Sequence, residues 1–83
     1  PLITATNNYL DELKVKGITR VNVRMVFIDG MGYSDYQFTN TKRFMQQQVT
    51  MALDSNPEWK RIEKARVRGY GISRAWELCY PTS

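Results

Sequence analysis

The chain has 83 residues, of which 42% are hydrophobic and 24% are charged, and its formal net charge at pH 7 is +4. This length allows one small domain, residues 1–83, and the composition is that of a folded globular protein rather than a disordered tail. There is no histidine and only one cysteine, Cys79, which excludes internal disulfides, Ser-His-Asp and Cys-His catalysis, and zinc sites built on imidazole. We therefore expect a protein that is not an enzyme and binds no metal or cofactor.

The apolar runs are far shorter than the roughly 18 residues that a membrane-spanning helix needs. The N-terminus lacks the charged and apolar regions of a signal peptide. Together with the single cysteine, these features predict a soluble protein of the cytoplasm or another reducing compartment.

The first predicted element is a helix over about residues 7–16. A threonine or an asparagine can cap its start, and Gly17 stands where a C-terminal capping glycine belongs. Its apolar side chains form one stripe, which contains Tyr9, Leu10 and Leu13.

A β-hairpin is predicted next. Residues 19–28 alternate between apolar and more polar side chains, with Val21, Val23, Met25 and Phe27 on the apolar side. A turn with two glycines, Gly30 and Gly32, follows, and residues 33–39 alternate again. Two such strands around a glycine-rich turn indicate a hairpin.

A second helix is predicted from a cap at Asn40 or Thr41 to about Leu53, before Pro57. Its apolar residues recur at spacings of three and four, which is typical of a helix that faces a core. We expect the core to depend mainly on Phe27, Phe44, Val49, Leu53 and Trp76.

The C-terminal third is predicted to hold two more strands. Asn56 and Pro57 can begin a helical turn that runs to Ile62, and residues 57–64 stay open between helix and strand. Residues 64–68 alternate as a strand, with Ala65 and Val67 on one face, and the glycines of residues 69–71 permit a turn. The last strand, residues 72–80, is apolar on both faces, so we expect it at the centre of the sheet.

The resulting order is α-β-β-α-β-β. It predicts an α+β two-layer sandwich, with a four-stranded, mostly antiparallel sheet and two helices on one face.

Positive charge is concentrated between Lys60 and Arg74. This window has six basic residues and one acidic residue, whereas the rest of the chain has six basic and seven acidic residues. Aromatic residues flank and interrupt the window, namely Trp59, Tyr70, Trp76 and Tyr80. The window is therefore the candidate contact surface.

In the predicted sheet, basic residues of the first strand share an exposed face with those of the basic window, and the helices cover the other face. The expected partner-binding residues are Arg20, Arg24, Trp59, Lys60, Arg61, Lys64, Arg66, Arg68, Tyr70 and Arg74.

Three interpretations of this face stay open. The favoured one is a non-catalytic binding protein, a small basic adaptor, linker or inhibitor, that docks on an acidic protein assembly. The alternative is a nucleic-acid-binding module, with phosphates on arginines and bases on aromatic rings. The third is an antiparallel sheet whose polar face is simply solvated.

Overall fold

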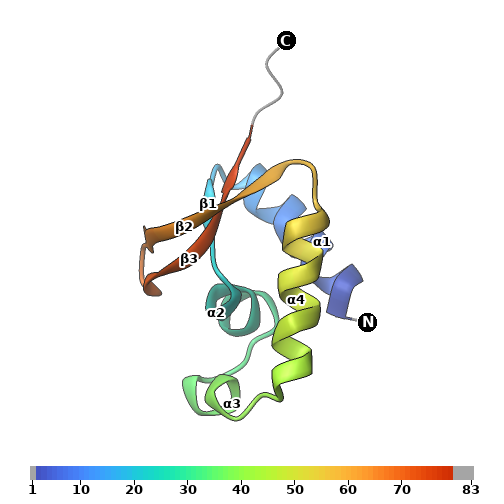
Figure 1. Ribbon diagram of the computed structural model, residues 1–83, viewed down its shortest axis with the longest axis vertical. Helices are drawn as coiled ribbons and strands as arrows, with labels where there is room; N and C mark the ends of the chain where they lie inside the picture. The colour runs from blue at the N-terminus through green and yellow to red at the C-terminus, as the bar shows by residue number, and fades with distance from the viewer. Residues whose placement is uncertain (1, 80–83) are drawn as a thin grey trace.

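The computed structural model describes residues 2–79, in which helices pack beside a three-stranded antiparallel sheet (Figure 1). The elements in chain order are α1 (Leu2–Val15), β1 (Arg20–Val21), α2 (Val23–Met25), the π-helical turn η1 (Val26–Gly30), α3 (Asp35–Thr39), α4 (Arg43–Ser55), β2 (Trp59–Val67) and β3 (Gly71–Leu78). The α+β class agrees with the prediction. The four-stranded sheet and the order α-β-β-α-β-β are wrong.

Helix α1 begins earlier than predicted and ends close to the predicted position. Its buried residues include the whole predicted stripe, Tyr9, Leu10 and Leu13. Gly17 follows the helix with φ 74°, and the Ile18 N–H donates to the Leu13 carbonyl at 2.9 Å. This is the left-handed C-terminal cap that the glycine predicted.

The predicted hairpin over residues 19–39 is wrong, because the chain turns into a helix after two strand residues. Asn22 is 2% exposed, and its side-chain oxygen accepts a 2.8 Å hydrogen bond from the Met25 N–H. This N-terminal cap starts α2, and η1 continues it. Val23, Val26 and Phe27 fit helical spacing, whereas Val23, Met25 and Phe27 fit the alternation of a strand, so the cap decides between the two.

The second half of the predicted hairpin is the short helix α3. The Ser34 hydroxyl accepts from the Gln37 N–H at 3.1 Å, and the Gln37 side chain accepts from the Ser34 N–H at 2.8 Å. This reciprocal capping box satisfies backbone groups that a strand would have paired with a neighbour.

Helix α4 confirms the second predicted helix, with Lys42 as the residue before its first turn. Val49, Ala52 and Leu53 are buried as predicted, but Phe44 is 55% exposed. Met45 of the same turn packs against the core, so Phe44 is exposed because it points to a different side of the helix from Met45 and Val49.

Of the two alternatives left open for residues 57–64, the structure shows the strand and not the helical turn from Asn56 to Ile62. The Asn56 side-chain oxygen accepts from the Glu58 N–H at 3.0 Å, which forms a local turn, and β2 begins at Trp59. The turn between β2 and β3 contains Gly69, and β3 begins at Gly71; both glycines have φ 85°.

The sheet order is β1-β3-β2, so the last strand is central, as predicted. β1 pairs with β3 through Arg20 and Val21, opposite Glu77 and Trp76. The predicted end of this strand at Tyr80 lies outside the described residues. Figure 1 shows the β2–β3 hairpin projecting to one side, away from α1.

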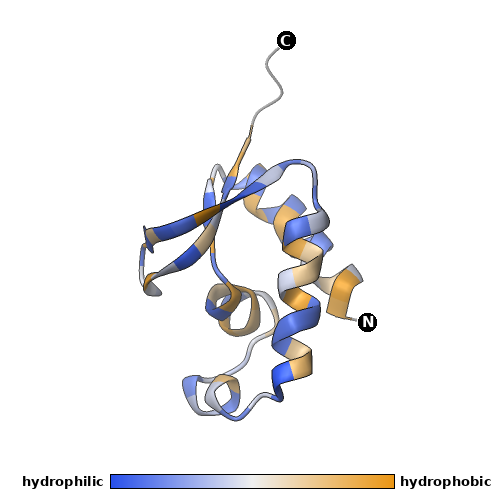
Figure 2. Cartoon of the chain, in the orientation of Figure 1, coloured by the Kyte–Doolittle hydropathy of each residue, from blue (hydrophilic) through white to orange (hydrophobic). Residues whose placement is uncertain are grey.

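The core lies between α1, η1, α4 and the base of the sheet, where Phe27 packs on Tyr33 and Phe38 at centroid distances of 5.4 and 5.6 Å. Gly30 lies against the Tyr9 ring, and a Cβ there would come within 2.9 Å of Tyr9 Cγ. The hairpin is mostly hydrophilic in Figure 2. Within residues 2–79, no helix has both the length and the apolar character that crossing a membrane requires.

Candidate functional site

The basic residues of the chain divide into paired and unpaired cations. Within residues 2–79, five of the twelve lysines and arginines form salt bridges. Three of these belong to the predicted partner-binding set, and their pairs are Arg20–Glu77, Arg24–Asp35 and Arg61–Asp54. An acidic neighbour balances each of these charges, so they contribute less to the field that a partner would meet.

Among residues 2–79, the other seven cations form no salt bridge, and all seven are exposed: Lys42, Arg43, Lys60, Lys64, Arg66, Arg68 and Arg74. Five lie on the β2–β3 hairpin or its turn, and all five were predicted. The other two, Lys42 and Arg43, stand at the start of α4 and were not predicted. We call these seven residues the unpaired cations.

A β-bulge shapes the hairpin. The pairing of β2 with β3 shifts between Ile62 and Ala65, so Glu63 and Lys64 together stand opposite the single residue Arg74. Beyond the bulge, Ala65 and Val67 are partly and fully buried, and Arg66 between them is exposed. This confirms the alternation predicted for this segment, while Arg68 lies past the end of the strand.

One face of β3 is turned toward α4. Ile72, Arg74 and Trp76 alternate onto the same face, and the Trp76 indole N–H donates to Asp54 of α4 at 2.9 Å. Arg66 is paired directly with Ile72 across the strands, so it lies on this face as well.

Arg20 and Arg24, the two predicted arginines outside the basic window, do not lie on this face of β3. Arg20 is paired with Glu77, which follows Trp76, so Arg20 lies on the opposite face of the sheet. Arg24 is on α2, because the predicted first strand is a helix at that point. The predicted single sheet face therefore does not form. Arg20 instead lines a cleft of about 500 Å³ together with Arg66, Arg68 and Tyr70, and Arg24 lines another cleft with Tyr70 and Arg74.

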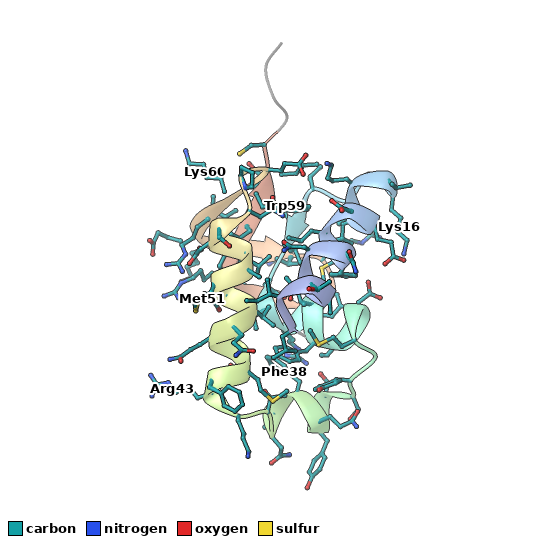
Figure 3. All side chains as sticks on the ribbon, turned by 90° about the vertical axis from the view of Figure 1, so that its right-hand side faces the viewer. Lys16, Phe38, Arg43, Met51, Trp59 and Lys60 are labelled. Atoms are coloured by element: carbon teal, nitrogen blue, oxygen red, sulfur yellow. The ribbon has the colours of Figure 1, made fainter. Side chains whose placement is uncertain are left out.

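A groove runs between α4 and β3. It encloses about 430 Å³ and is lined by Arg43, Gln46, Gln47, Thr50, Met51 and Arg74. We call this the α4–β3 groove. A larger cleft of about 530 Å³ shares Gln46, Thr50 and Arg74 with it and reaches Arg24 and Tyr70. In Figure 3, Arg43 and Met51 lie on one side of the molecule and Lys16 on the other.

The start of α4 is electropositive. Its first turn has no acidic residue, and Lys42, at the capping position, makes no side-chain capping bond. A helix N-terminus carries positive partial charge and prefers acidic neighbours, so lysine and arginine there oppose the helix dipole. The positive end of the helix dipole and the two cations make this end complementary to an anion.

Side chains in the groove differ in how firmly they are held. The Gln46 amide donates to the Thr41 hydroxyl at 2.7 Å, which fixes it against the start of the helix. Within the described residues, Arg43 and Gln47 make no side-chain hydrogen bond to the protein. Their polar groups are therefore available to a ligand.

Asp54 joins the end of α4 to the hairpin. Its carboxylate accepts from Trp76 Nε1 at 2.9 Å and from Arg61 Nε at 3.0 Å. The Arg61 guanidinium also lies 5.6 Å from the centroid of the Trp76 ring. This cluster holds Arg61 of β2 and Trp76 of β3 against the end of the helix, and its partners are too far apart in the chain to be recognised from the sequence.

The two predicted aromatic contacts are not equally accessible. Trp59 is 3% exposed, so it is part of the core, and its indole nitrogen has no hydrogen-bond partner among the described residues. Tyr70 is half-buried at the hairpin turn. Burial, followed by the nearby Asp29 carboxylate, raises the pKa of Tyr70.

Residues 2–79 contain no group of three or more acidic or cysteine side chains that could hold a metal ion. Cys79 is exposed and unpaired. Comparison of the chain with protein-family models, curated proteins and solved structures finds no significant match.

Proposed function

We propose that the protein is a non-catalytic nucleic-acid-binding module whose contact surface joins the start of α4 to the β2–β3 hairpin. The observation that carries this proposal is the distribution of the seven unpaired cations, which lie on these two elements alone. Phosphate backbones are bound chiefly by lysine and arginine side chains and by helix N-termini.

The α4–β3 groove supports this proposal, because it brings the two elements into one surface. Arg43 comes from α4 and Arg74 from β3, and both line the groove. Polar side chains, Gln46, Gln47 and Thr50, lie between them. A surface with cations at its borders and hydrogen-bonding groups between them suits phosphates outside and bases within.

Salt dependence tests the proposal. We expect the protein to bind a mixed-sequence DNA duplex with an affinity that falls linearly on a log–log plot against salt concentration. Four phosphate contacts would give a slope of about −3.6. Fluorescence anisotropy at four or more salt concentrations measures this slope.

Two charge-matched variants sharpen this experiment. Arg74→Gln removes an unpaired cation from the groove, so it should weaken binding and reduce the slope by about 0.9. Lys16→Gln removes the same charge from the turn that follows α1, on the side opposite Arg43, and should change neither by much (Figure 3). Equal effects of the two variants would show that only net charge matters and would refute the proposed surface.

The second candidate is the acidic protein partner that the sequence favours. Its support is apolar exposure beside the cations: Met51 in the groove is 63% exposed, and Ile72 on the groove-facing side of β3 is 54% exposed. Such side chains are typical of protein interfaces. This reading predicts capture of a partner that survives nuclease treatment, depends weakly on salt, and is lost in Ile72→Ser.

A further inference from the structure

We infer that the nucleic acid is B-form double-stranded DNA, and that Arg43 and Gln47 of α4 read its bases, Arg43 a guanine and Gln47 an adenine. This inference rests on the proposed function. It assigns sequence preference to two residues of α4, and it assigns backbone contact to the cations of the hairpin.

Arg43 and Gln47 are placed to act together. They are four residues apart on α4, so they lie on the same face of the helix, and both line the α4–β3 groove. Both are exposed, and neither side chain is engaged by another described residue. The opposite face of the helix is occupied by the core residues Val49 and Leu53.

The chemistry of the two side chains matches the major groove. The arginine fork pairs with O6 and N7 of guanine, and the glutamine amide pairs with N6 and N7 of adenine. Four helical residues span about 6 Å along the axis, and successive base pairs are about 3.4 Å apart. The two side chains can therefore address bases about two steps apart.

Other side chains on this face of α4 are already engaged, so base contacts are confined to the first two turns of the helix. Gln46 is tied to Thr41, so its amide nitrogen is already used. At the far end, the Asp54 carboxylate is held by Arg61 and Trp76, which keeps its charge paired and away from phosphates. The N-terminal part of a reading helix is where base contacts are expected.

The width of an α-helix indicates which form of duplex nucleic acid α4 can enter. An α-helix with side chains is about 10–12 Å across, and the major groove of B-DNA is about 12 Å wide. The deep, narrow major groove of A-form RNA does not admit such a helix. Of the two duplex forms, only B-form DNA therefore admits α4 to its major groove.

Selection from a randomised duplex pool, followed by competition binding, tests this inference. We expect the wild-type protein to enrich a site with a G·C pair and an A·T pair about two steps apart. Replacing either pair should weaken binding about 5- to 150-fold.

Gln47→Ala should remove the preference at the adenine position and keep binding to random duplex. Arg43→Lys should relax the guanine position while its charge is retained, because lysine lacks the fork. Gln48→Ala is the matched control, since Gln48 is the next residue of α4, is exposed, and does not line the groove.

The results separate this inference from the proposed function. Binding with a steep salt slope but no enriched site, equal effects of Gln47→Ala and Gln48→Ala, or equal affinity for duplex RNA would each overturn the inference and leave the proposed function standing. Absence of binding to any nucleic acid, even at low salt, would overturn both.

Discussion

The indole N–H of Trp76 donates a 2.9 Å hydrogen bond to the carboxylate of Asp54, and so connects the central strand to the last turn of α4. Trp76 is 1% exposed, whereas the Asp54 side chain is 41% exposed. The pair thus lies where the core meets the surface. It fixes the hairpin relative to the helix, which is the relationship on which the proposed contact surface depends.

Removal of this acceptor should destabilise the fold. Asp54→Ala leaves a buried indole N–H without a partner, which costs about 1–3 kcal/mol. The lost ion pair with Arg61 adds at most about 1 kcal/mol, because both side chains are more than one-third exposed. Asp54→Asn keeps an acceptor oxygen and should lose less. Urea unfolding measures both variants, and equal stability of Asp54→Ala and the wild type would contradict the account.

Two phenylalanines provide a matched test of the core. Phe27 is fully buried against Tyr33 and Phe38, so Phe27→Ala should cost about 3–5 kcal/mol. Phe44 is 55% exposed, so Phe44→Ala should change stability by no more than about 0.5 kcal/mol. Thermal unfolding of both variants gives the comparison, and a larger loss in Phe44→Ala would mean that α4 is rotated from the position described.

Tyr9 makes stability depend on pH in the alkaline range. Burial, followed by its 2.6 Å hydrogen bond to Asp29, raises the pKa of Tyr9 above its ordinary value of 10.0. The unfolded chain therefore loses this proton above pH 10 while the folded protein keeps it, so the stabilisation is complete below pH 10 and is lost as pH rises further.

Tyr9→Phe isolates this effect, because it removes the ionisable group and retains the ring. The variant should be less stable than the wild type by about 1 kcal/mol near neutral pH, since it lacks the bond to Asp29. Above pH 10 the difference should shrink as the wild type loses stability. Urea unfolding from pH 7 to 11 tests this, and a difference that stays constant over that range would refute it.

Lys42 should show opposite effects on stability and binding. Its backbone is extended, with φ −69° and ψ 147°, as a capping residue requires. Lys42→Asp would supply the missing cap and suit the helix dipole, which should stabilise the protein by about 1 kcal/mol. The same change should weaken nucleic-acid binding, because it places an anion at the proposed contact. Lys42→Gln, which removes the charge without adding a good cap, is the control. Unchanged binding in Lys42→Asp would exclude the start of α4 from the interface.

The sequence was informative where local signals agreed with the fold. Gly17 marked the end of α1, residues 69–71 marked the hairpin turn, and the apolar faces of the last strand marked it as central. The hairpin prediction for the segment after β1 was wrong because its apolar residues are compatible with the period of a strand and with that of a helix. The caps at Asn22 and Ser34 select the helix in this segment.

The candidate site could be predicted only in part. The five hairpin cations were found from charge density, since all of them lie in the basic window. The sequence does not show which cations are neutralised by salt bridges. Arg20 and Glu77, for example, are 57 residues apart and meet only in the folded sheet. The sequence does contain a signal for the start of α4 as a contact site. Lys42 and Arg43 stand where helices prefer acidic residues, so they are unfavourable for the helix itself.

Chemical-shift mapping by NMR, with ¹⁵N-labelled protein titrated with a DNA duplex, tests whether the contact surface joins the start of α4 to the hairpin. The perturbed backbone amides should fall in residues 42–50 and residues 60–74, on both sides of the α4–β3 groove. Amides of α1 and of Lys16, which follows it, should remain unshifted. Perturbations confined to α1 and β1, or spread evenly over the surface, would contradict the proposed contact surface.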